Sequence, residues 1–302
     1  MNRFLRDGRA VALFIVPAFL IYLFTVLVPI VWSFSYSLYT GMPGLKFTFS
    51  GVYNYLHMWS DPGFLSSFWI NAKYVLVVVA GQVGLGLAMA LLFMFVVKRF
   101  KTTVRTLVFF PVVLPVVAVG QLFSKMFEIT PNNGLVNSFL VMVGLSSWVQ
   151  PWLGQGDTAL AVLSFMDIWT ATGFYAVIFY AALMDIPKDL LEAAAIDGVG
   201  RWRMLWSILL PLIKPITITC LIFSFTGTLK LFESSIALNG GGPGGATKSL
   251  SMYMYDNSFL YSQYGYGSAI AVFILVECIV VTIILNRLFQ SRHARPGFNP
   301  WL

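Results

Sequence analysis

Long apolar stretches dominate this sequence and restrict it to a small set of folds. Six of them approach or exceed the roughly 20 apolar residues that an α-helix needs to cross the hydrocarbon core of a bilayer. Lipid offers the backbone no hydrogen-bond partners, so each stretch must satisfy its own backbone as a helix. We therefore predict an all-α integral membrane protein with six transmembrane helices, near Val11–Trp32, Tyr74–Val97, Val104–Phe127, Ala159–Met184, Ile208–Phe232 and Tyr266–Phe289.

The composition indicates that a bilayer is the solvent of this chain. Of its 302 residues, 58% are hydrophobic and 10% are charged, whereas soluble globular domains have about 25% charged residues. No internal repeat, low-complexity tract or soluble domain separates the six stretches. We expect a single transmembrane domain over residues 11–290, with short tails at residues 1–10 and 291–302.

Arginines before the first stretch raise the alternative of a signal peptide. The apolar run is longer than that of a signal peptide, and no cleavage site with small residues follows it. We expect this stretch to remain as a transmembrane helix.

Basic residues are distributed unequally between the two ends of these helices. Fourteen of the 19 lysines and arginines lie in the two tails, the second-to-third loop and the fourth-to-fifth loop. Because Lys and Arg are retained on the cytoplasmic side, we expect both termini in the cytoplasm. The net charge of +7 raises the alternative of a nucleic-acid ligand. Anionic membrane lipid explains cations at helix ends, so we expect no nucleic acid partner.

Side chains suited to catalysis or metal binding are scarce. Cys220 and Cys278 both lie in predicted spans, where they offer neither a disulfide framework nor a metal-ligand cluster. We expect no metal site and no catalytic residue in this chain.

One cytoplasmic loop, residues 185–203, has the signals of a short helix. Asp185 can act as its N-cap, Pro187 suits its first turn, and a run of alanines follows. Gly198 or Gly200 would end it. Such a helix can lie on the membrane surface or bind a partner, and residue chemistry alone does not separate these alternatives.

The order of residues in this loop favours the partner-binding alternative. Glu-Ala-Ala at residues 192–194 is followed by Asp197-Gly198 and then by Ile208 and Pro211. This order resembles the EAA loop of ATP-binding-cassette (ABC) import permeases, and the resemblance covers most of the chain. Further segments are similar to the sugar-importer branch typified by maltose and glycerol-phosphate permeases: Phe-Pro-Val-Val-Leu-Pro at 110–115, Asn-Gly-Gly-Gly-Pro at 239–243 and Gly-Ser-Ala at 267–269.

The resemblance implies the type I ABC importer permease fold with a cytoplasmic coupling helix. In that family the helix docks into a cleft of an ATPase subunit and transmits its closure to the membrane helices. Glu192 can pair with a basic residue of the partner, and Gly198 permits a turn that other residues make only at a cost. The residues implied in ATPase coupling are Glu192, Ala193, Ala194, Asp197, Gly198 and Arg201.

Polar side chains inside a bilayer are costly and therefore mark candidate substrate contacts. The helix face that carries Asp167 mixes a carboxylate, a hydroxyl and an aromatic ring, which can hydrogen-bond to a sugar and stack against it. Alignment on Glu192 places the sugar-contacting positions of the maltose-type permease on Asp167, Thr170, Ala171, Phe174, Ser224 and Thr228. A helix-to-helix hydrogen bond is the alternative role for Asp167, and the favoured one for Glu277.

The third span and the cations bear on the identity of the substrate. The positions that correspond to polar contacts in the maltose-type permease are Val112 and Val116, so both the sugar and a fixed membrane site stay open. No arginine lies inside the predicted spans, and Lys125 and Lys230 lie near outer helix ends. Because a phosphorylated substrate would find few cations, we favour a neutral disaccharide or oligosaccharide.

No ATP site is expected in this chain. The segment 241–249 (Gly-Gly-Pro-Gly-Gly-Ala-Thr-Lys-Ser) has Thr247 where a phosphate-binding P-loop needs Gly before Lys, and it lies in an outer loop. The resemblance implies that Mg-ATP binds a partner. It also implies a second permease subunit, two ATP-binding subunits and an extracytoplasmic sugar-binding protein, assembled in the bacterial cytoplasmic membrane.

Three other functions agree with parts of the sequence. An ion-coupled secondary transporter would use Asp167 and Glu277, and it would work without ATP. A membrane-embedded hydrolase would use these carboxylates as acid and base, but they lie in distant spans, and no second acid lies near Asp167 in the sequence. A sensor subunit that only docks a binding protein has no need of the EAA spacing.

Overall fold

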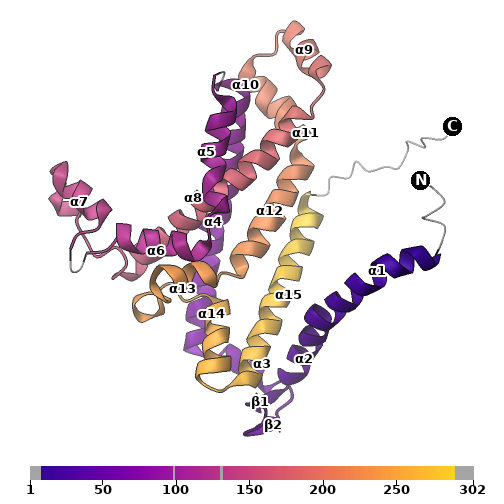
Figure 1. Ribbon diagram of the computed structural model, residues 1–302, viewed down its shortest axis with the longest axis vertical. Coiled ribbons are helices and arrows are strands. Elements are labelled where there is room, and N and C mark those ends of the chain that lie inside the picture. The colour runs from indigo at the N-terminus through magenta and orange to yellow at the C-terminus, as the bar shows by residue number, and fades with distance from the viewer. Residues whose placement is uncertain (1–7, 98, 130–131, 290–302) are drawn as a thin grey trace. The chain divides into compact units, whose positions relative to one another are not determined.

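The computed structural model describes residues 8–97, 99–129 and 132–289, drawn in Figure 1. They fall into two compact units. The first unit combines the chain up to Leu65 with Tyr253–Leu275, and the second combines Ser66–Met252 with the chain from Val276 onward. Five of the basic residues assigned to the cytoplasmic side lie outside the described residues: Arg3, Arg6, Lys98, Arg292 and Arg295.

The first unit joins the first apolar stretch to a small hairpin. The rings of Tyr39 and Phe47 stack at 4.7 Å across the hairpin. The buried side chain of Asn54 donates to the carbonyls of Ser37 and Tyr39 at 2.8 and 2.7 Å, and so fastens the hairpin to the helix that follows. The elements are α1 (Gly8–Tyr22), a π-helical turn (Leu23–Leu27), α2 (Val28–Tyr36), the antiparallel strands β1 (Tyr39–Gly41) and β2 (Phe47–Phe49), α3 (Tyr53–Met58), a second π-helical turn (Asp256–Leu260) and the first part of α15 (Tyr264–Phe289).

The second unit contains the other apolar stretches and the predicted loop helix. Its elements are α4 (Pro62–Phe95, whose first turn belongs to the first unit), α5 (Lys101–Val113), α6 (Val116–Met126), α7 (Leu135–Met142), a 3₁₀ turn (Ser146–Trp148), α8 (Gly156–Met184), α9 (Lys188–Ile196), α10 (Arg201–Met204), a π-helical turn (Leu205–Leu209), α11 (Leu210–Leu212), α12 (Lys214–Leu229), α13 (Glu233–Asn239), a 3₁₀ turn (Pro243–Gly245), the first half of α14 (Leu250–Tyr255) and the end of α15.

Four helices of the described chain are long and apolar enough to cross a membrane. They are Ala12–Tyr36, Pro62–Phe95, Gly156–Met184 and Tyr264–Leu288. These confirm the first, second, fourth and sixth predicted stretches as helices, although the second begins well before the predicted Tyr74. The third and fifth stretches are each a pair of helices bent at a short break.

The third stretch was predicted as one helix over Val104–Phe127, and that continuity is wrong. The axes of α5 and α6 differ by 96°. Pro115 explains the break, because its ring disfavours a helical conformation for the preceding residue. Leu114 is accordingly extended, with φ −72° and ψ 139°.

The fifth stretch, predicted as one helix over Ile208–Phe232, is also broken. The axis changes by 68° between Arg201–Leu212 and α12, and Ile213 leaves the helical region with φ −86° and ψ 3°. Pro215 in the first turn of α12 has no N–H with which to bond the carbonyl of Pro211, so a continuous helix would lose a hydrogen bond here.

Helices α5 and α8 lie side by side, as Figure 1 shows, and a glycine permits their close approach. A Cβ on Gly173 of α8 would overlap the backbone carbonyl of Val108 in α5. The guanidinium of Arg105 lies 4.8 Å from the ring centroid of Tyr180, which adds a cation–π contact to the same pair. Small residues at a crossing are the usual basis of helix packing in lipid, where van der Waals contact replaces the hydrophobic effect.

Helices α6 and α13 approach each other in the same way. A Cβ on Gly120 would overlap the side chain of Ala237, and Gln121 donates its amide N–H to the carbonyl of Ala237 at 3.2 Å. This contact holds α13 beside α6 at the end of α12.

The predicted loop helix is present as α9, but its N-terminus differs from the prediction. Asp185 lies at the C-terminal end of α8 rather than at the start of α9. Pro187, with an extended ψ of 130°, immediately precedes the first helical residue, Lys188. Asp185 cannot cap α9 because α8 continues through Met184 and leaves Asp185 in a helical conformation.

Gly198 ends α9 in the left-handed conformation, with φ +74°. The amides of Gly198 and Val199 donate to the carbonyls of Ala195 and Ala194 at 3.1 and 3.0 Å. These two bonds are those of a Schellman cap, in which the residue after the helix is usually glycine. The turn predicted at Gly198 is therefore present.

Gly198→Ala should destabilise this turn, whereas Gly200→Ala should not. A Cβ meets no atom within 4 Å at either position, so only the backbone conformation distinguishes them. The left-handed conformation costs a residue with a Cβ about 1 kcal/mol or more, while Gly200 has φ −64°. Hydrogen exchange of the α9 amides in the detergent-solubilised protein should be faster in Gly198→Ala only. Equal exchange in the two variants would contradict the capping role.

Candidate functional site

A cavity of about 380 Å³ lies within the second unit, between α4, α6, α8, α12 and the start of α13. Five of the six predicted substrate residues line it: Asp167, Thr170, Ala171, Ser224 and Thr228. Its volume falls in the range of small-molecule sites, which combine apolar walls with a few placed polar groups. The cavity has both, since Phe223 and Val116 line it together with hydroxyl, amide and carboxylate groups.

The carboxyl group of Asp167 is the centre of a hydrogen-bond network in the cavity wall. The hydroxyl of Tyr74 donates to it, and the hydroxyl of Ser234 also bonds it. Gln82 donates to the backbone carbonyl of Asp167 at 3.2 Å and accepts from Ser224 at 2.8 Å. The network joins α4, α8 and α12, so the helix-to-helix bond considered for Asp167 is present, and the residue also lines the cavity.

Two predicted hydroxyls are oriented by their own helices. Thr170 donates to the carbonyl of Met166 at 2.8 Å, and Thr228 donates to that of Ser224 at 2.7 Å. Because their protons are engaged, both hydroxyls can offer the cavity only acceptor lone pairs. They suit a ligand that donates hydrogen bonds.

Phe174 is the predicted substrate residue that does not line the cavity. It is exposed, and its ring meets that of Tyr175 edge-on at 5.2 Å. At this turn of α8 the cavity is lined by Tyr175 instead. Of the two apolar positions noted in the third stretch, Val116 lines the cavity and Val112 does not.

Several polar cavity residues were not assigned to the pathway from the sequence, among them Gln82, Lys230 and Glu233. Gln82 lies in a predicted span, and the cost of burying a polar group in lipid was the signal that would have identified it. Lys230 and Glu233 reach the cavity because α12 ends at Leu229 and the chain turns directly into α13. The described lining residues of the cavity thus include one lysine and two carboxyl groups, those of Asp167 and Glu233.

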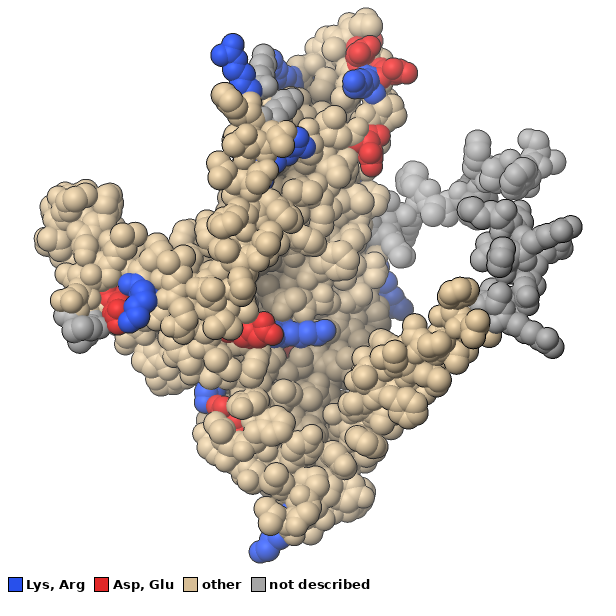
Figure 2. Space-filling model, in the orientation of Figure 1, with Lys and Arg blue, Asp and Glu red and all other residues tan. Residues whose placement is uncertain are grey.

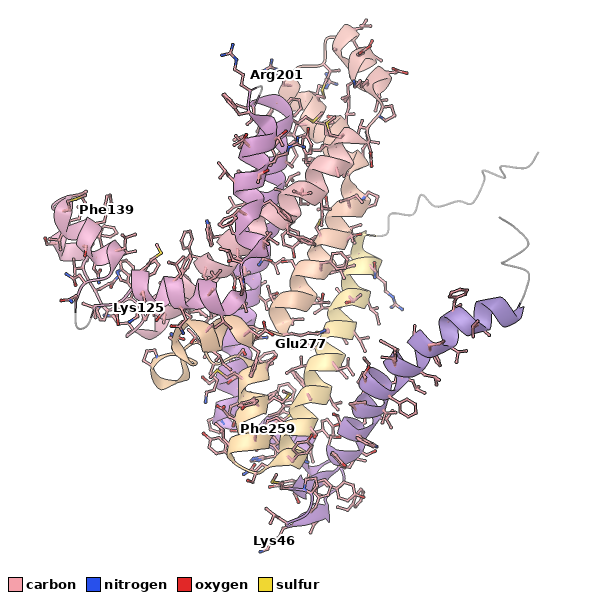
Figure 3. All side chains as sticks on the ribbon, viewed as in Figure 1. Lys46, Lys125, Phe139, Arg201, Phe259 and Glu277 are labelled. Carbon is pink, nitrogen blue, oxygen red and sulfur yellow. The ribbon has the colours of Figure 1, made fainter. Side chains whose placement is uncertain are left out.

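Glu277 lies apart from this cavity, on α15, where Figure 3 labels it. It is not among the cavity-lining residues. Its Oε2 is buried and has no hydrogen-bond partner among the described residues. The structure therefore does not bring Asp167 and Glu277 together in one lined site.

Helix α9 presents an exposed surface with both charged and apolar groups. Glu192 and Asp197 are exposed, Ile196 is 86% exposed, and Ala194 is buried against the rest of the unit. Figure 2 shows charged side chains gathered at this end of the unit, above a broad uncharged surface. Figure 3 shows Arg201 projecting from the same end.

An open groove of about 690 Å³ runs beside α9. It is lined by the end of α8, by α9 and by α11, and its lining residues include Ile186, Leu190, Ala193 and Leu212. Of the predicted coupling residues, Ala193 lines this groove. The groove and the exposed face of α9 together offer a partner an apolar surface with carboxylates near it.

The glycine-rich segment 241–249 folds back on itself. The amide of Thr247 donates to the carbonyl of Gly241 at 2.9 Å, its hydroxyl donates to Asn239 at 2.8 Å, and its carbonyl accepts from Ser235 at 2.6 Å. These bonds engage the polar groups of Thr247 within the loop. In the parts of the chain that the structure describes, no group of three His, Cys, Asp or Glu residues could hold a metal ion.

A second polar cluster lies in the first unit, around Asp61. Its Oδ2 accepts from the hydroxyls of Tyr253 at 2.7 Å and Tyr266 at 2.6 Å, and its Oδ1 accepts from the amide of Gly63 at 2.9 Å. Burial raises the pKa of Asp61, but these hydrogen bonds outweigh burial and leave the pKa below its usual value. Burial and the bond to Asp61 raise the pKa of Tyr253 to about 12.

Asp61→Asn should lower the thermal stability of the protein at pH 7, with a smaller effect in acid. Because the pKa of Asp61 is lowered by folding, its carboxylate stabilises the fold above the unfolded-state pKa, and this contribution is lost as pH falls through the folded-state pKa. We expect a cost on the order of 1 kcal/mol, typical of one weakened hydrogen bond. Thermal unfolding in detergent at pH 7 and pH 3 measures it. The same difference between parent and variant at both pH values would contradict the assignment.

The family comparison matches most of the chain. Residues 82–295 match the model of the family described as "Binding-protein-dependent transport system inner membrane component". The trehalose/maltose transport system permease protein MalF of Thermococcus litoralis is 32% identical over 288 residues, which cover 95% of this chain and 96% of that protein. The sulfoquinovosyl glycerol transport system permease protein SmoG of Agrobacterium fabrum is 33% identical over 259 residues, covering 86% and 82% of the two chains. The lactose transport system permease protein LacF of Rhizobium radiobacter is 30% identical over 279 residues, covering 90% and 91%.

Solved structures share the fold. A chain from the crystal structure of a bacterial ABC transporter involved in the import of the acidic polysaccharide alginate aligns with a TM-score of 0.82 at 22% identity, covering 95% of this chain and 96% of that one. Because the alignment covers 95% of this chain, it includes residues of both units.

Proposed function

Since the chain belongs to the family of binding-protein-dependent transport system inner membrane components, we propose that it is one of two permease subunits of an ABC importer that carries a neutral di- or oligosaccharide inward across the bacterial cytoplasmic membrane. The observation that carries the proposal is the cavity around Asp167, in which carboxyl, amide and hydroxyl groups face aromatic side chains.

Several predictions from the sequence are settled at the level of the family. The relatives are permease proteins, so the chain is a membrane transport subunit and not an enzyme. The mostly helical ABC importer permease fold is confirmed. An ion-coupled secondary transporter is not favoured, because the family works with a binding protein.

The chemistry of the cavity favours a neutral sugar over an anion. Among the described residues, Lys230 is the one cation that lines the cavity, and Asp167 and Glu233 line it too, so an anionic group would meet more repulsion than attraction. Thr170 and Thr228 present acceptor oxygens that suit sugar hydroxyls. Two relatives are named for neutral sugars, trehalose and maltose in one case and lactose in the other, whereas the alginate transporter imports an acidic polysaccharide. The substrate class proposed for this chain therefore rests on the chemistry of its own cavity.

The topology that we propose has six crossings with both termini in the cytoplasm. It counts each of the two bent pairs as one span and takes residues 11–290 as one permease domain, with cytoplasmic tails at 1–10 and 291–302. The excess of Lys and Arg in the tails and in two loops supports this orientation. Membrane lipid is the partner of the exposed apolar helix surfaces, such as that of α7, where Phe139 is labelled in Figure 3.

The coupling helix in this proposal is α9. Its exposed carboxylates and apolar residues would dock on an ATPase subunit through Glu192, Ala193, Asp197 and Arg201, and Mg-ATP would bind on that partner. Ala194, predicted as a docking residue, is buried against the permease itself, and Gly198 forms the turn that ends the helix. Two ATPase subunits, a second permease and an extracytoplasmic sugar-binding protein complete the assembly. A related alginate transporter was crystallised with its substrate-bound periplasmic protein, which supports the last of these partners.

Transport follows from a shift between two conformations. ATP binds more tightly to the partner subunits when the transporter faces outward, so ATP binding favours the outward-facing state. Helix α9 transmits that preference to the membrane helices. The cavity then accepts sugar from the binding protein. Hydrolysis restores the inward-facing state, and the sugar leaves to the cytoplasm.

Reconstituted uptake tests the proposed function. The chain, a second permease and the ATPase are placed in liposomes with the binding protein outside and ATP inside. Uptake of radiolabelled trehalose, maltose, lactose and an anionic alginate oligosaccharide is measured. We expect ATP-dependent uptake of at least one neutral sugar. Asp167→Asn keeps an acceptor for Tyr74 and replaces the carboxyl group with an amide, and we expect it to slow uptake at least tenfold.

Two outcomes would contradict the proposal. Uptake that proceeds without ATP and follows an imposed ion gradient would favour the ion-coupled alternative. ATP-dependent uptake of anionic sugars alone would keep the importer and overturn the neutral substrate class.

A further inference from the structure

The first unit contains a pocket that the transport cavity does not share. It has a volume of about 360 Å³. The rings of Tyr53, His57 and Tyr266 line it, together with the polar side chains of Thr40, Asn54 and Gln263. No Lys, Arg, Asp or Glu is among these described lining residues. Its surface is therefore aromatic and polar without fixed charge.

Two of the lining side chains are fixed by hydrogen bonds to groups that do not line the pocket. Tyr266 is 4% exposed and donates its hydroxyl to Asp61 at 2.6 Å. The amide of Asn54 is fixed by its bonds to the hairpin backbone at Ser37 and Tyr39. Because these anchors lie outside the pocket, its shape is present before any ligand arrives, which lowers the entropic cost of binding.

On the side of the β1–β2 hairpin, backbone atoms line the pocket. Gly41, which also lines the pocket, has φ +89°, and a Cβ there would overlap the carbonyl of Lys46. Gly265 brings the start of α15 against the carbonyl of Tyr39 in the same manner. Glycine at both positions lets the hairpin and α15 close on each other.

Three neighbouring aromatic rings line the pocket. The rings of Tyr53 and His57 are nearly parallel, with centroids 5.8 Å apart and an interplanar angle of 6°. His57 and Tyr266 are tilted by 52° at 5.2 Å. A sugar ring has apolar C–H faces and polar hydroxyl edges, so its faces suit the rings and its edges suit the amide and hydroxyl groups.

We propose that this pocket is an outer subsite that binds one neutral pyranose unit of the transported saccharide, separately from the cavity around Asp167. The inference rests on the proposed function for its orientation, because segment 33–73 is an outer loop only in that topology. The two sites share no lining residue, so each can be altered without touching the other.

Sugar binding to the assembled transporter tests the inference. The permease pair with its ATPase is placed in lipid nanodiscs without ATP or binding protein, and saturation-transfer NMR is recorded with trehalose, maltose and lactose in turn. We expect transfer to at least one sugar. Tyr53→Ala should raise its half-saturation concentration roughly tenfold, as for loss of one well-placed aromatic contact, while Tyr53→Phe should stay close to the parent because the ring remains.

Matched variants separate this pocket from other effects. Leu56→Ala changes an exposed residue of the same helix α3 outside the pocket, and we expect parental binding. Asp167→Asn changes only the transport cavity and should leave the Tyr53-dependent signal in place. Because Tyr53 is 55% exposed, its replacement does not threaten the fold.

The inference and the proposed function fail differently. If the parent binds none of the three sugars, or if Tyr53→Ala binds them as the parent does, the outer subsite is wrong even when ATP-dependent uptake is observed. If Tyr53→Ala leaves sugar binding unchanged but weakens a separate pull-down of the binding protein by the same nanodiscs, the pocket is a protein contact and the inference is also wrong. Tyr53-dependent sugar binding without ATP-dependent uptake would instead keep the subsite and overturn the proposed importer.

Discussion

Glu192→Lys is expected to strip the ATPase from the purified complex while the second permease remains bound. Glu192 is exposed on α9, where its carboxylate can pair with a basic residue in the docking cleft. Reversing its charge replaces that attraction with repulsion in a desolvated interface, where losing one charge of a pair costs about 2–5 kcal/mol. A cost of this size lowers the affinity by at least tenfold. Co-purification after detergent extraction, with each subunit quantified, measures the loss.

Two further variants make the Glu192 result specific. Glu192→Gln removes the charge without reversing it and should give an intermediate loss. Glu128→Lys makes the same change of charge in a different loop, where Glu128 pairs with Lys125 at 3.0 Å on an exposed surface. Such surface pairs contribute little, so we expect a complete complex. Full ATPase recovery with Glu192→Lys would show that α9 does not dock through this residue.

Gly173→Leu is expected to abolish the folded protein in the membrane. A Cβ at this position already overlaps the carbonyl of Val108, and backbone cannot move aside as a side chain can. Leucine would force α5 and α8 apart and remove the contacts that hold them. Overpacking typically costs about 1–3 kcal/mol, and the cost is larger where backbone rather than a side chain is in the way. Membrane extracts should contain little monodisperse protein by fluorescence-detected size-exclusion chromatography.

Gly84→Leu is the control for this substitution. Gly84 is an exposed residue of α4, also inside a long apolar helix, and a Cβ there meets nothing within 4 Å. The variant adds the same side chain and should give parental yield and elution. Equal loss in both variants would mean that leucine itself, rather than the α5–α8 crossing, causes the defect.

The apolar stretches could be located from the sequence because the bilayer imposes a simple rule on each of them separately. Four of the six helices were placed within a few residues at their C-terminal ends, as with Gly156–Met184 and Tyr264–Leu288. The breaks at Leu114 and Ile213 were not predicted. Proline is tolerated in many membrane helices, so Pro115 and Pro215 show where a helix can bend, and packing decides whether it does.

The candidate site was only partly predictable. Asp167 could be selected because polar groups inside spans are costly. Ser224 and Thr228 came from the alignment with the maltose-type permease. Lys230 and Glu233 could not, since they enter the cavity only through the turn between α12 and α13. The pocket at Tyr53 and Tyr266 could not be predicted from the sequence either, because it joins residues more than 200 positions apart in the chain.

The sequence by itself determined that this chain is a membrane protein of ABC importer permease type, because hydrophobic length and the EAA spacing are local properties. Only the tertiary structure decided which polar groups meet. The bond between Tyr74 and Asp167, the approach of Gly173 to Val108 and the cluster at Asp61 each join separate helices. Contacts of this kind depend on the rotation and crossing of packed helices, which no local pattern specifies.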